Sequence, residues 1–274
     1  SSKLGMLIDS SVLCNTLPNF QWLDINNSAD VILNSCGYEY NPHPNWPVTG
    51  AELRLETFVD CGLGEYATKR NFPALEDGTS RLSPYLRFGR LSIRECYRAI
   101  LREKLVSHSK ALGVQCWENE LIWRDFYAMI LYHNPSSQYQ ELLPQYRNLV
   151  WRKEEGLWQR FVNAETGYPI IDAAIKQLYT LNWMHNRCRM IVASFLTKHL
   201  LIDWRLGEEW FAQHLMDYEL ASNVGGWQWA ASTGTDAQPY FRVFNPVLQS
   251  KKFDPDGDYI KAYLPQLRNL DIRS

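Results

Sequence analysis

The 274-residue sequence has no apolar run long enough to cross a bilayer, which predicts a protein without a membrane-spanning helix. Its first residues lack the charged segment and apolar stretch of a secretory signal, so we expect a protein that is not secreted. The six cysteines are scattered and include no C-x-x-C pair. This spacing indicates reduced thiols in a cytoplasmic protein, with neither a disulfide framework nor a metal site.

An excess of charge is also missing. The formal net charge of −2 argues against general binding of polyanions, although it allows a local basic patch. No segment alternates apolar and polar residues for long enough to predict a β-strand, and no internal repeat is present. Aromatic residues, in contrast, make up 14% of the chain and include 11 tryptophans, within a hydrophobic content of 46% that is ample for a buried core.

The chain divides at about residue 48. Residues 1–48 contain the turn-forming clusters "NNSAD" and "NPHPNWP" and no strong periodicity, which predicts an interdomain linker or arm. From residue 49 to residue 274 helical signals dominate. We therefore expect one all-α, multi-helical domain after an irregular linker.

Capping signals and periodicity locate the helices of this domain. Thr49 and Glu52 form a capping box before a helix that ends near Gly62, and Ser92 and Glu95 form a second one. The second helix is expected to turn Ile93, Tyr97, Ile100 and Leu101 inward. Further helices are expected over about 114–133, 169–181 and 184–200, after Asp203, and around 218–223.

The segment "GTSRLSP" at 78–84 places Ser83 as N-cap and Pro84 as first helical residue. Free backbone N–H groups beside the hydroxyls of Thr79, Ser80 and Ser83 suit a diphosphate. A plain capped helix is the alternative.

The segment "WENELIWRDFY" at 117–127 spaces Glu120, Trp123, Arg124 and Tyr127 by three and four residues, so they share one helix face. Aromatic and charged residues on one face are typical of a pocket wall. The alternative is a half-buried helix with an ion pair of its own.

The segment "NWMHNRCRM" at 182–190 sets Asn186 and Met190 on one stripe, with Arg187 and Arg189 beside it, a combination suited to phosphate and base contacts. We interpret His185 as structural. Asp217 and Glu219 lie shortly before Asn223, where they could balance Arg189 or bind a heterocycle.

Taken in order, these segments and "GGWQWAASTGTDAQPYFRVFNP" resemble the photolyase/cryptochrome family, with class I cyclobutane pyrimidine dimer photolyases the nearest group. The resemblance runs from about residue 46 to the C-terminus. It implies a helical domain that binds FAD in a U shape. The FAD contacts that it implies are Tyr66, Thr79, Ser80, Arg81, Leu82, Ser83, Trp117, Arg189, Asp217, Glu219 and Asn223.

Three of these residues have more specific implied roles. Asn223 lies next to the flavin N5 in the family, where a neutral amide accommodates a reduced ring. Arg189 pairs with Asp217. The family usually has Asp where Glu219 stands, so the hydrogen bond to the flavin ring is expected to be longer or shifted.

The resemblance also implies a pocket for a DNA lesion. Trp123 and Trp229 are expected to hold two pyrimidines by stacking and edge contact, and Arg70 to lie near the DNA backbone. The full set comprises Arg70, Glu120, Trp123, Asn186, Arg187, Met190 and Trp229.

Three tryptophans match the family's electron-relay positions: Trp227, Trp204 and Trp151. Trp227 is expected to face the flavin, while Trp229, two residues later, faces the substrate. The alternative is that all three are core residues. With Asn223 and Glu120, these tryptophans are the residues expected to take part in catalysis.

The activity implied is light-driven repair of cyclobutane pyrimidine dimers, by electron transfer from excited reduced FAD to a flipped-out lesion. We expect a monomeric carbon–carbon lyase that acts on damaged DNA. The family's N-terminal α/β antenna domain is absent from the sequence, so we expect this chain not to bind a folate or deazaflavin antenna chromophore.

Three alternatives remain open. The first is a cryptochrome, a blue-light sensor that acts through protein partners. The second is a (6-4) photolyase, but this class requires a histidine pair where Asn186 and Met190 stand, which argues against it. The third is a helical interaction module without a cofactor.

Overall fold

The computed structural model describes residue 46 and residues 50–270 except 107, 238 and 240–242. Within these ranges every regular element is a helix, which confirms the predicted all-α fold. All of the elements lie in one compact unit, Val48–Ser274. The predicted linker over 1–48 lies outside the described residues apart from Trp46.

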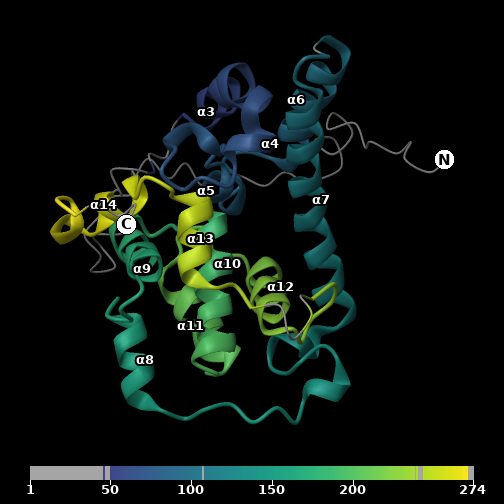
Figure 1. The fold of residues 1–274 in the computed structure, drawn as a ribbon. Coiled ribbons are helices and arrows are strands. Elements are labelled where there is room, and N and C mark those ends of the chain that lie inside the picture. Colours follow the sequence, from purple (N-terminus) through teal and green to yellow (C-terminus); the bar gives the residue numbers. More distant parts are fainter. Residues whose placement is uncertain (1–45, 47–49, 107, 238, 240–242, 271–274) are drawn as a thin grey trace, which may run out of the picture. The chain divides into compact units, whose positions relative to one another are not determined.

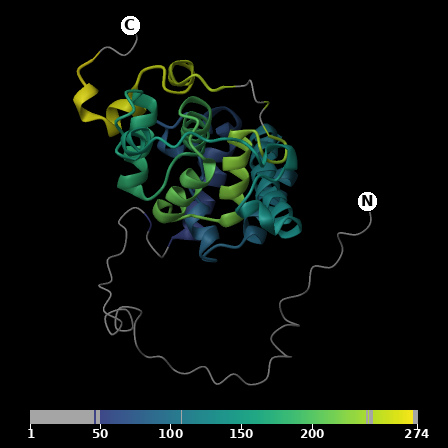
Figure 2. The ribbon, with the colours of Figure 1, turned by 90° about the horizontal axis from the view of Figure 1, so that it is seen from below.

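Twelve α-helices are described, joined by short 3₁₀ and π-helical turns. Figure 1 and Figure 2 place α10, α11 and α12 between α7 on one side and α8 and α9 on the other. The helices are α3 (Ala51–Thr57), α4 (Tyr66–Lys69), α5 (Ser83–Arg87), α6 (Ile93–Val106), α7 (Ala111–His133), α8 (Glu155–Val162), α9 (Pro169–Leu181), α10 (Asn186–Ser194), α11 (Trp204–His214), α12 (Leu220–Ala231), α13 (Pro246–Phe253) and α14 (Asp258–Tyr263).

Local capping chemistry explains several helix ends. Pro169 begins α9, and Asn182 ends it in the left-handed conformation at φ 49°, as the predicted span 169–181 requires. The Asp203 side chain accepts the backbone N–H of Arg205 at 3.0 Å and caps α11. Ser92 and Glu95 form the predicted capping box, because each side chain accepts the backbone N–H of the other residue.

Other predicted boundaries were wrong. The helix expected from residue 184 begins at Asn186, because His185 is its N-cap, and it changes to a π-helical turn over Phe195–His199. Helices α8, α13 and α14 were not predicted. Tyr97 and Leu101 are exposed rather than inward, at 40% and 44%. The capping box at Thr49 lies partly outside the described residues.

The core lies where α9, α10, α11 and α12 meet. Its largest fully buried side chains include Trp204, Trp227, Phe161, Phe211 and Tyr259. Burial of each such side chain contributes roughly 1.5–3 kcal/mol or more. The core therefore holds α10 and α12, which both contribute to the candidate site, in fixed positions.

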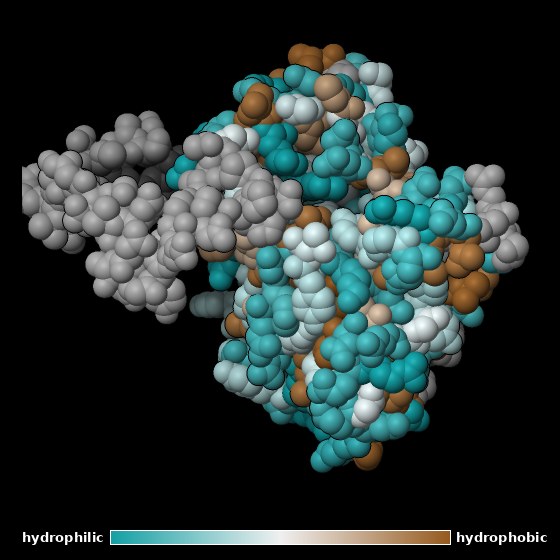
Figure 3. Space-filling model, turned by 90° about the vertical axis from the view of Figure 1, so that its left-hand side faces the viewer, coloured by the Kyte–Doolittle hydropathy of each residue, from teal (hydrophilic) through white to brown (hydrophobic). Residues whose placement is uncertain are grey.

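The surface in Figure 3 is mainly hydrophilic, with apolar residues scattered over it. Within the described part of the chain, no helix is both long and apolar enough to cross a membrane.

Two adjacent glycines of α12 make a matched test of packing. A Cβ at Gly225 would lie 2.1 Å from the Tyr127 ring on α7, whereas a Cβ at Gly226 would meet nothing within 4 Å. We expect Gly225→Ala to lower the free energy of unfolding by about 1–3 kcal/mol. Gly226→Ala should raise it by roughly 0.5–1 kcal/mol, because alanine favours the helix. Urea unfolding measures both, and equal effects would contradict the close packing of α12 on α7.

Candidate functional site

A cavity of about 800 Å³ opens between α5, α7, α10, α11 and α12. Protein interiors are close-packed, so a space of this size between rigid helices indicates a ligand site. The volume falls within the roughly 300–1,000 Å³ of small-molecule and cofactor pockets.

Twelve of the residues singled out from the sequence line this cavity. They come from α5, α7, α10 and α12, from the loop before α12 and from Arg70, which directly follows α4, so tertiary packing brings together segments far apart in the chain. From the predicted cofactor set the cavity has Ser83, Arg189, Asp217, Glu219 and Asn223; from the lesion set it has Arg70, Glu120, Trp123, Asn186, Met190 and Trp229; and it has the relay residue Trp227.

The α7 face predicted from helical spacing is confirmed as a cavity wall, since Glu120, Trp123, Arg124 and Tyr127 all line it. The Trp123 and Tyr127 rings stack with centroids 6.0 Å apart. Trp123 is 41% exposed, so its remaining surface is available to a further ring.

Other predicted site residues do not line the cavity. Tyr66 and Trp117 are buried against the Phe58 ring, at centroid distances of 5.5 and 5.1 Å. Burial raises the pKa of the Tyr66 hydroxyl far above its usual range. The remaining residues outside the cavity wall are Thr79, Ser80, Arg81, Leu82, Arg187, Trp204 and Trp151.

The start of α5 corrects one prediction. Ser83 is the first residue of the helix and not its N-cap; Leu82 occupies the cap position without a side-chain hydrogen bond. The Ser83 hydroxyl accepts the indole N–H of Trp183 at 3.2 Å instead. Arg81 has a left-handed φ of 50°, and its guanidinium lies 5.3 Å from the Trp183 ring. Two residues at the start of α5, Arg81 and Ser83, therefore both contact Trp183.

Arg189 and Asp217 form the predicted ion pair. One guanidinium nitrogen, Nη2, donates to both carboxylate oxygens, at 2.9 and 2.8 Å, and Nε donates to the Met184 carbonyl. The Asp217 side chain is 2% exposed, so its charge needs this partner. The pair fixes a charged group at the cavity wall.

Asn223 is oriented by a residue that the sequence reasoning missed. Its amide nitrogen donates to the Glu208 carbonyl at 3.1 Å and to the Glu208 carboxylate at 3.0 Å. Tyr218 donates to the same carboxylate at 3.0 Å. The amide oxygen of Asn223 is thus left as an acceptor. No local signal marked Glu208, which lies 15 residues before Asn223.

Glu219 is the N-cap of α12. Its carboxylate accepts the backbone N–H groups of Ala221 and Ser222, at 3.1 and 2.9 Å, and the Ser222 hydroxyl at 2.8 Å. A carboxylate at a helix N-terminus is favoured by the helix dipole. Glu219, which is longer than the Asp expected from the family, therefore caps α12 and also lines the cavity.

A second polar pair lines the same cavity. Arg70 donates to the Glu120 carboxylate. Burial alone would lower the pKa of Arg70, but the neighbouring Glu120 raises it above its ordinary value. Arg187 lies close by, donates to the Asn71 side chain and stacks 4.4 Å from the Phe253 ring. This end of the site supplies guanidinium groups suited to phosphate.

The three candidate relay tryptophans have different surroundings. Trp227 is 1% exposed, lies 5.0 Å from the Phe211 ring and packs against Gly207 of α11. Trp204, one turn before Gly207, is fully buried, whereas Trp151 is half-buried at the edge of the same core.

The described residues include no candidate metal site, because they contain no cluster of three or more His, Cys, Asp or Glu side chains that could hold a metal ion.

The fold and cavity define a helical domain built to enclose a large, partly polar ligand. A family model described as the FAD binding domain of DNA photolyase matches residues 117–274. The chain belongs to this family.

Curated relatives with similar sequences are photo-lyases. The chain is similar to the deoxyribodipyrimidine photo-lyases of Alkalihalophilus pseudofirmus, with 46% identity over 87% of this chain and 48% of that protein, and of Synechococcus sp., with 50% identity over 81% and 46%. The chain spans about half the length of these relatives.

Solved structures share the fold. A bacterial class III photolyase from Agrobacterium tumefaciens has a TM-score of 0.77 and 42% identity, over 82% of this chain and 46% of that one. A Synechocystis cryptochrome has a TM-score of 0.76 and 33% identity, over 85% and 52%.

Proposed function

We propose that this chain is the FAD-binding and lesion-binding domain of a deoxyribodipyrimidine photo-lyase, which splits pyrimidine dimers in DNA with light. The observation that carries this proposal is a cavity of about 800 Å³ in which five of the predicted flavin contacts meet six of the predicted lesion contacts. The sequence similarity to proteins of that name also supports the proposal.

The residues present fit FAD. The cavity is large enough, and its wall offers hydroxyl, amide and guanidinium groups from Ser83, Asn223 and Arg189. Asn223, oriented by Glu208, presents its amide oxygen to a flavin ring. Bound and reduced, FAD supplies a light-excited electron donor, and the protein's part is to hold it beside the lesion in a site that excludes water.

The lesion side is built by Trp123, Trp229 and Met190. Trp123 and Trp229 come from α7 and α12, so they offer aromatic surfaces from two helices. A dimer must leave the duplex to reach them, as photolyases as a class require. Arg70 supplies a phosphate contact, so binding should weaken as salt rises. We also propose that the domain acts as a monomer in the cytoplasm.

The test uses the purified chain with FAD and an oligonucleotide that carries a cyclobutane dimer. We expect a flavin absorption spectrum and a loss of dimers under blue light. Trp229→Ala should weaken lesion binding by about 1–3 kcal/mol, or roughly five- to 150-fold, because one stacking surface is lost. Tyr132→Ala, on the exposed end of α7 and outside the cavity, is the matched control.

The outcomes separate the alternatives. Failure to bind FAD would favour a helical interaction module. A photoactive flavin without dimer loss would favour a cryptochrome, and repair of (6-4) products alone would favour that photolyase class. Equal lesion affinity for wild type and Trp229→Ala would reject the assignment of Trp229.

A further inference from the structure

A buried carboxylate faces one of the three candidate relay tryptophans. The indole N–H of Trp204 donates to Glu141 Oε1 at 3.4 Å, and both residues are almost fully buried. The indole nitrogens of Trp227 and Trp151 are also buried, but they have no hydrogen-bond partner among the described residues. Trp204 and Trp227 are therefore equally buried but differ in their electrostatic surroundings.

The Glu141 carboxylate is held in place by an ion pair with Arg205. Arg205 donates from Nη2 to Glu141 Oε2 at 2.7 Å, while its Nη1 donates to both carboxylate oxygens of Asp203, at 2.9 and 3.0 Å. The Arg205 guanidinium lies 4.9 Å from the Trp204 ring. Trp204 thus contacts one carboxylate, that of Glu141, and one guanidinium, that of Arg205, which is shared with Asp203. A second guanidinium, that of Arg147, donates from Nε to the Glu141 backbone carbonyl at 3.1 Å.

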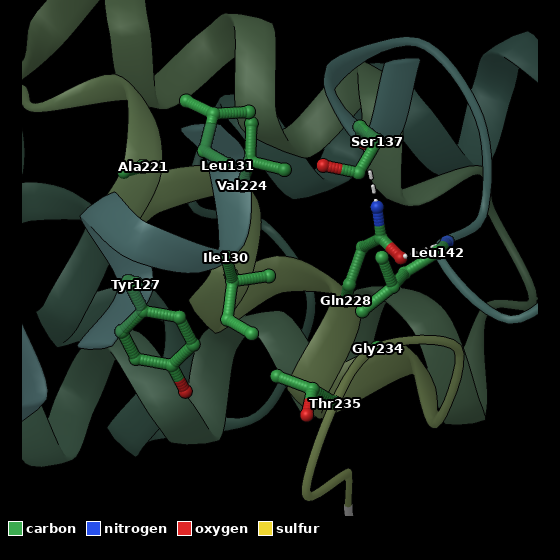
Figure 4. A pocket seen from close by; sticks show the side chains of 11 residues that line it. Tyr127, Ile130, Leu131, Ser137, Leu142, Ala221, Val224, Gln228, Gly234 and Thr235 are labelled. Atoms are coloured by element: carbon green, nitrogen blue, oxygen red, sulfur yellow. Dashed lines mark hydrogen bonds between the residues drawn. The ribbon is translucent and has the colours of Figure 1, made fainter. Parts of the chain in front are cut away.

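The backbone around Glu141 is anchored as well. The backbone N–H of Leu142 donates to Gln228 Oε1 at 2.8 Å, and the Gln228 amide nitrogen donates to the Ser137 carbonyl at 2.7 Å (Figure 4). Gln228 is 2% exposed and lies between Trp227 and Trp229 on α12. The helix that carries the first relay ring therefore also fixes the loop that carries Glu141.

A carboxylate in this position is a costly feature unless it has a use. Burying a charge incurs a desolvation penalty that its ion pair only partly offsets, so Glu141 is a weak source of stability. A fixed negative charge a few Å from an indole does, however, stabilise a positive charge on that ring, because the interior screens charges less than water does.

We propose that Glu141 makes Trp204 easier to oxidise than Trp227 and so draws positive charge away from Trp227. This inference rests on the proposed function. Trp227 would first lose one electron to photoexcited flavin that is not yet fully reduced, and would then regain one from Trp204. Trp204 becomes a radical cation, no proton moves, and Glu141 stays ionised. Glu141 is a positioning residue that acts through Trp204.

The contact itself can be tested in the dark. In the FAD-loaded chain labelled with ¹⁵N at the indoles, the Trp204 resonance is identified by its loss in Trp204→Phe. We expect Glu141→Gln to move this resonance and to leave the Trp227 resonance in place. Glu154→Gln, which neutralises an exposed carboxylate paired to Arg152, is the matched control and should move neither. An unmoved Trp204 resonance in Glu141→Gln would overturn the proposal.

Flash photolysis tests the electrostatic effect. We expect Glu141→Gln to lower the yield of long-lived tryptophan radical by about tenfold, since a lost charge–charge interaction of roughly 1.4 kcal/mol shifts an equilibrium by that factor. Glu141→Asp should restore part of the yield, and Glu154→Gln should match wild type. An unchanged yield in Glu141→Gln would also overturn the proposal.

Two further outcomes are distinguishable. If wild type itself forms no tryptophan radical, the relay in the proposed function fails, while the dark experiment still reports on Glu141. If Glu141→Gln does not fold, Arg205→Gln tests the same electrostatic effect on Trp204, because it removes a positive charge near the ring instead of a negative one. Removing this cation should increase the radical yield, and a decrease would contradict the proposal.

Discussion

Trp227→Phe is expected to slow light-driven reduction of bound flavin by more than tenfold while leaving repair by chemically reduced protein near the wild-type rate. A phenyl ring is much harder to oxidise than an indole, and each added 1.4 kcal/mol of barrier costs about a factor of ten in rate. Trp227 lines the cavity and packs on α11, which carries Trp204, so we expect it to lie between the proposed flavin site and the next relay ring. Flavin bleaching under anaerobic illumination measures the first effect.

The matched control is Trp210→Phe. Trp210 is 5% exposed, lies 5.4 Å from the Phe211 ring and does not line the cavity, so the substitution removes the same atoms from the same core. Each substitution should cost stability through a small cavity, up to a few kcal/mol. Equal photoreduction by the two variants would reject the relay role of Trp227.

Acidification is expected to destabilise the folded chain through His185. Burial, together with the nearby charges of Arg81, Arg187 and Arg189, lowers the pKa of this imidazole from 6.5 to about 3. The unfolded chain takes up a proton below pH 6.5 that the folded chain does not accept. Stability is therefore complete above pH 6.5 and is lost as the pH falls towards 3.

The expected loss between pH 6.5 and 4.5 is about 2–3 kcal/mol, at roughly 1.4 kcal/mol per pH unit. His185→Asn removes the titrating group while an amide oxygen can still accept the Arg187 N–H that His185 Nδ1 accepts at 3.1 Å. We expect this variant to show a shallower acid limb in urea unfolding than wild type. The exposed His133→Asn is the control, and an acid limb as steep in His185→Asn as in wild type would refute the assignment.

Much of the site was predictable because its signals are local. The spacing of Glu120, Trp123 and Tyr127 on α7 indicated one face, and that face lines the cavity. An ion pair between Arg189 and Asp217, 28 residues apart, was one of two alternatives until the family resemblance favoured it, and the structure shows the ion pair. The functional roles of these residues stay predictions until the experiments above are done.

The missed features depend on contacts between distant segments. Glu208 holds Asn223, Gln228 holds the loop before Leu142, and Glu141 meets Trp204 across 63 residues of sequence. Ser83 was wrongly assigned as an N-cap, because its hydroxyl is used by Trp183, 100 residues away. Polar side chains choose partners by proximity in the folded protein, which single-segment patterns do not record.

The sequence by itself determined the helical class of the chain, the ends of α9, the caps at Ser92 and Asp203, and the family. These features depend on side chains within about four residues of one another, or on an ordered set of motifs. Only the tertiary structure decided which carboxylates border which tryptophans and which predicted residues reach the cavity. The reason is physical: the position of a buried charge is set by how helices pack, and packing depends on the whole chain at once.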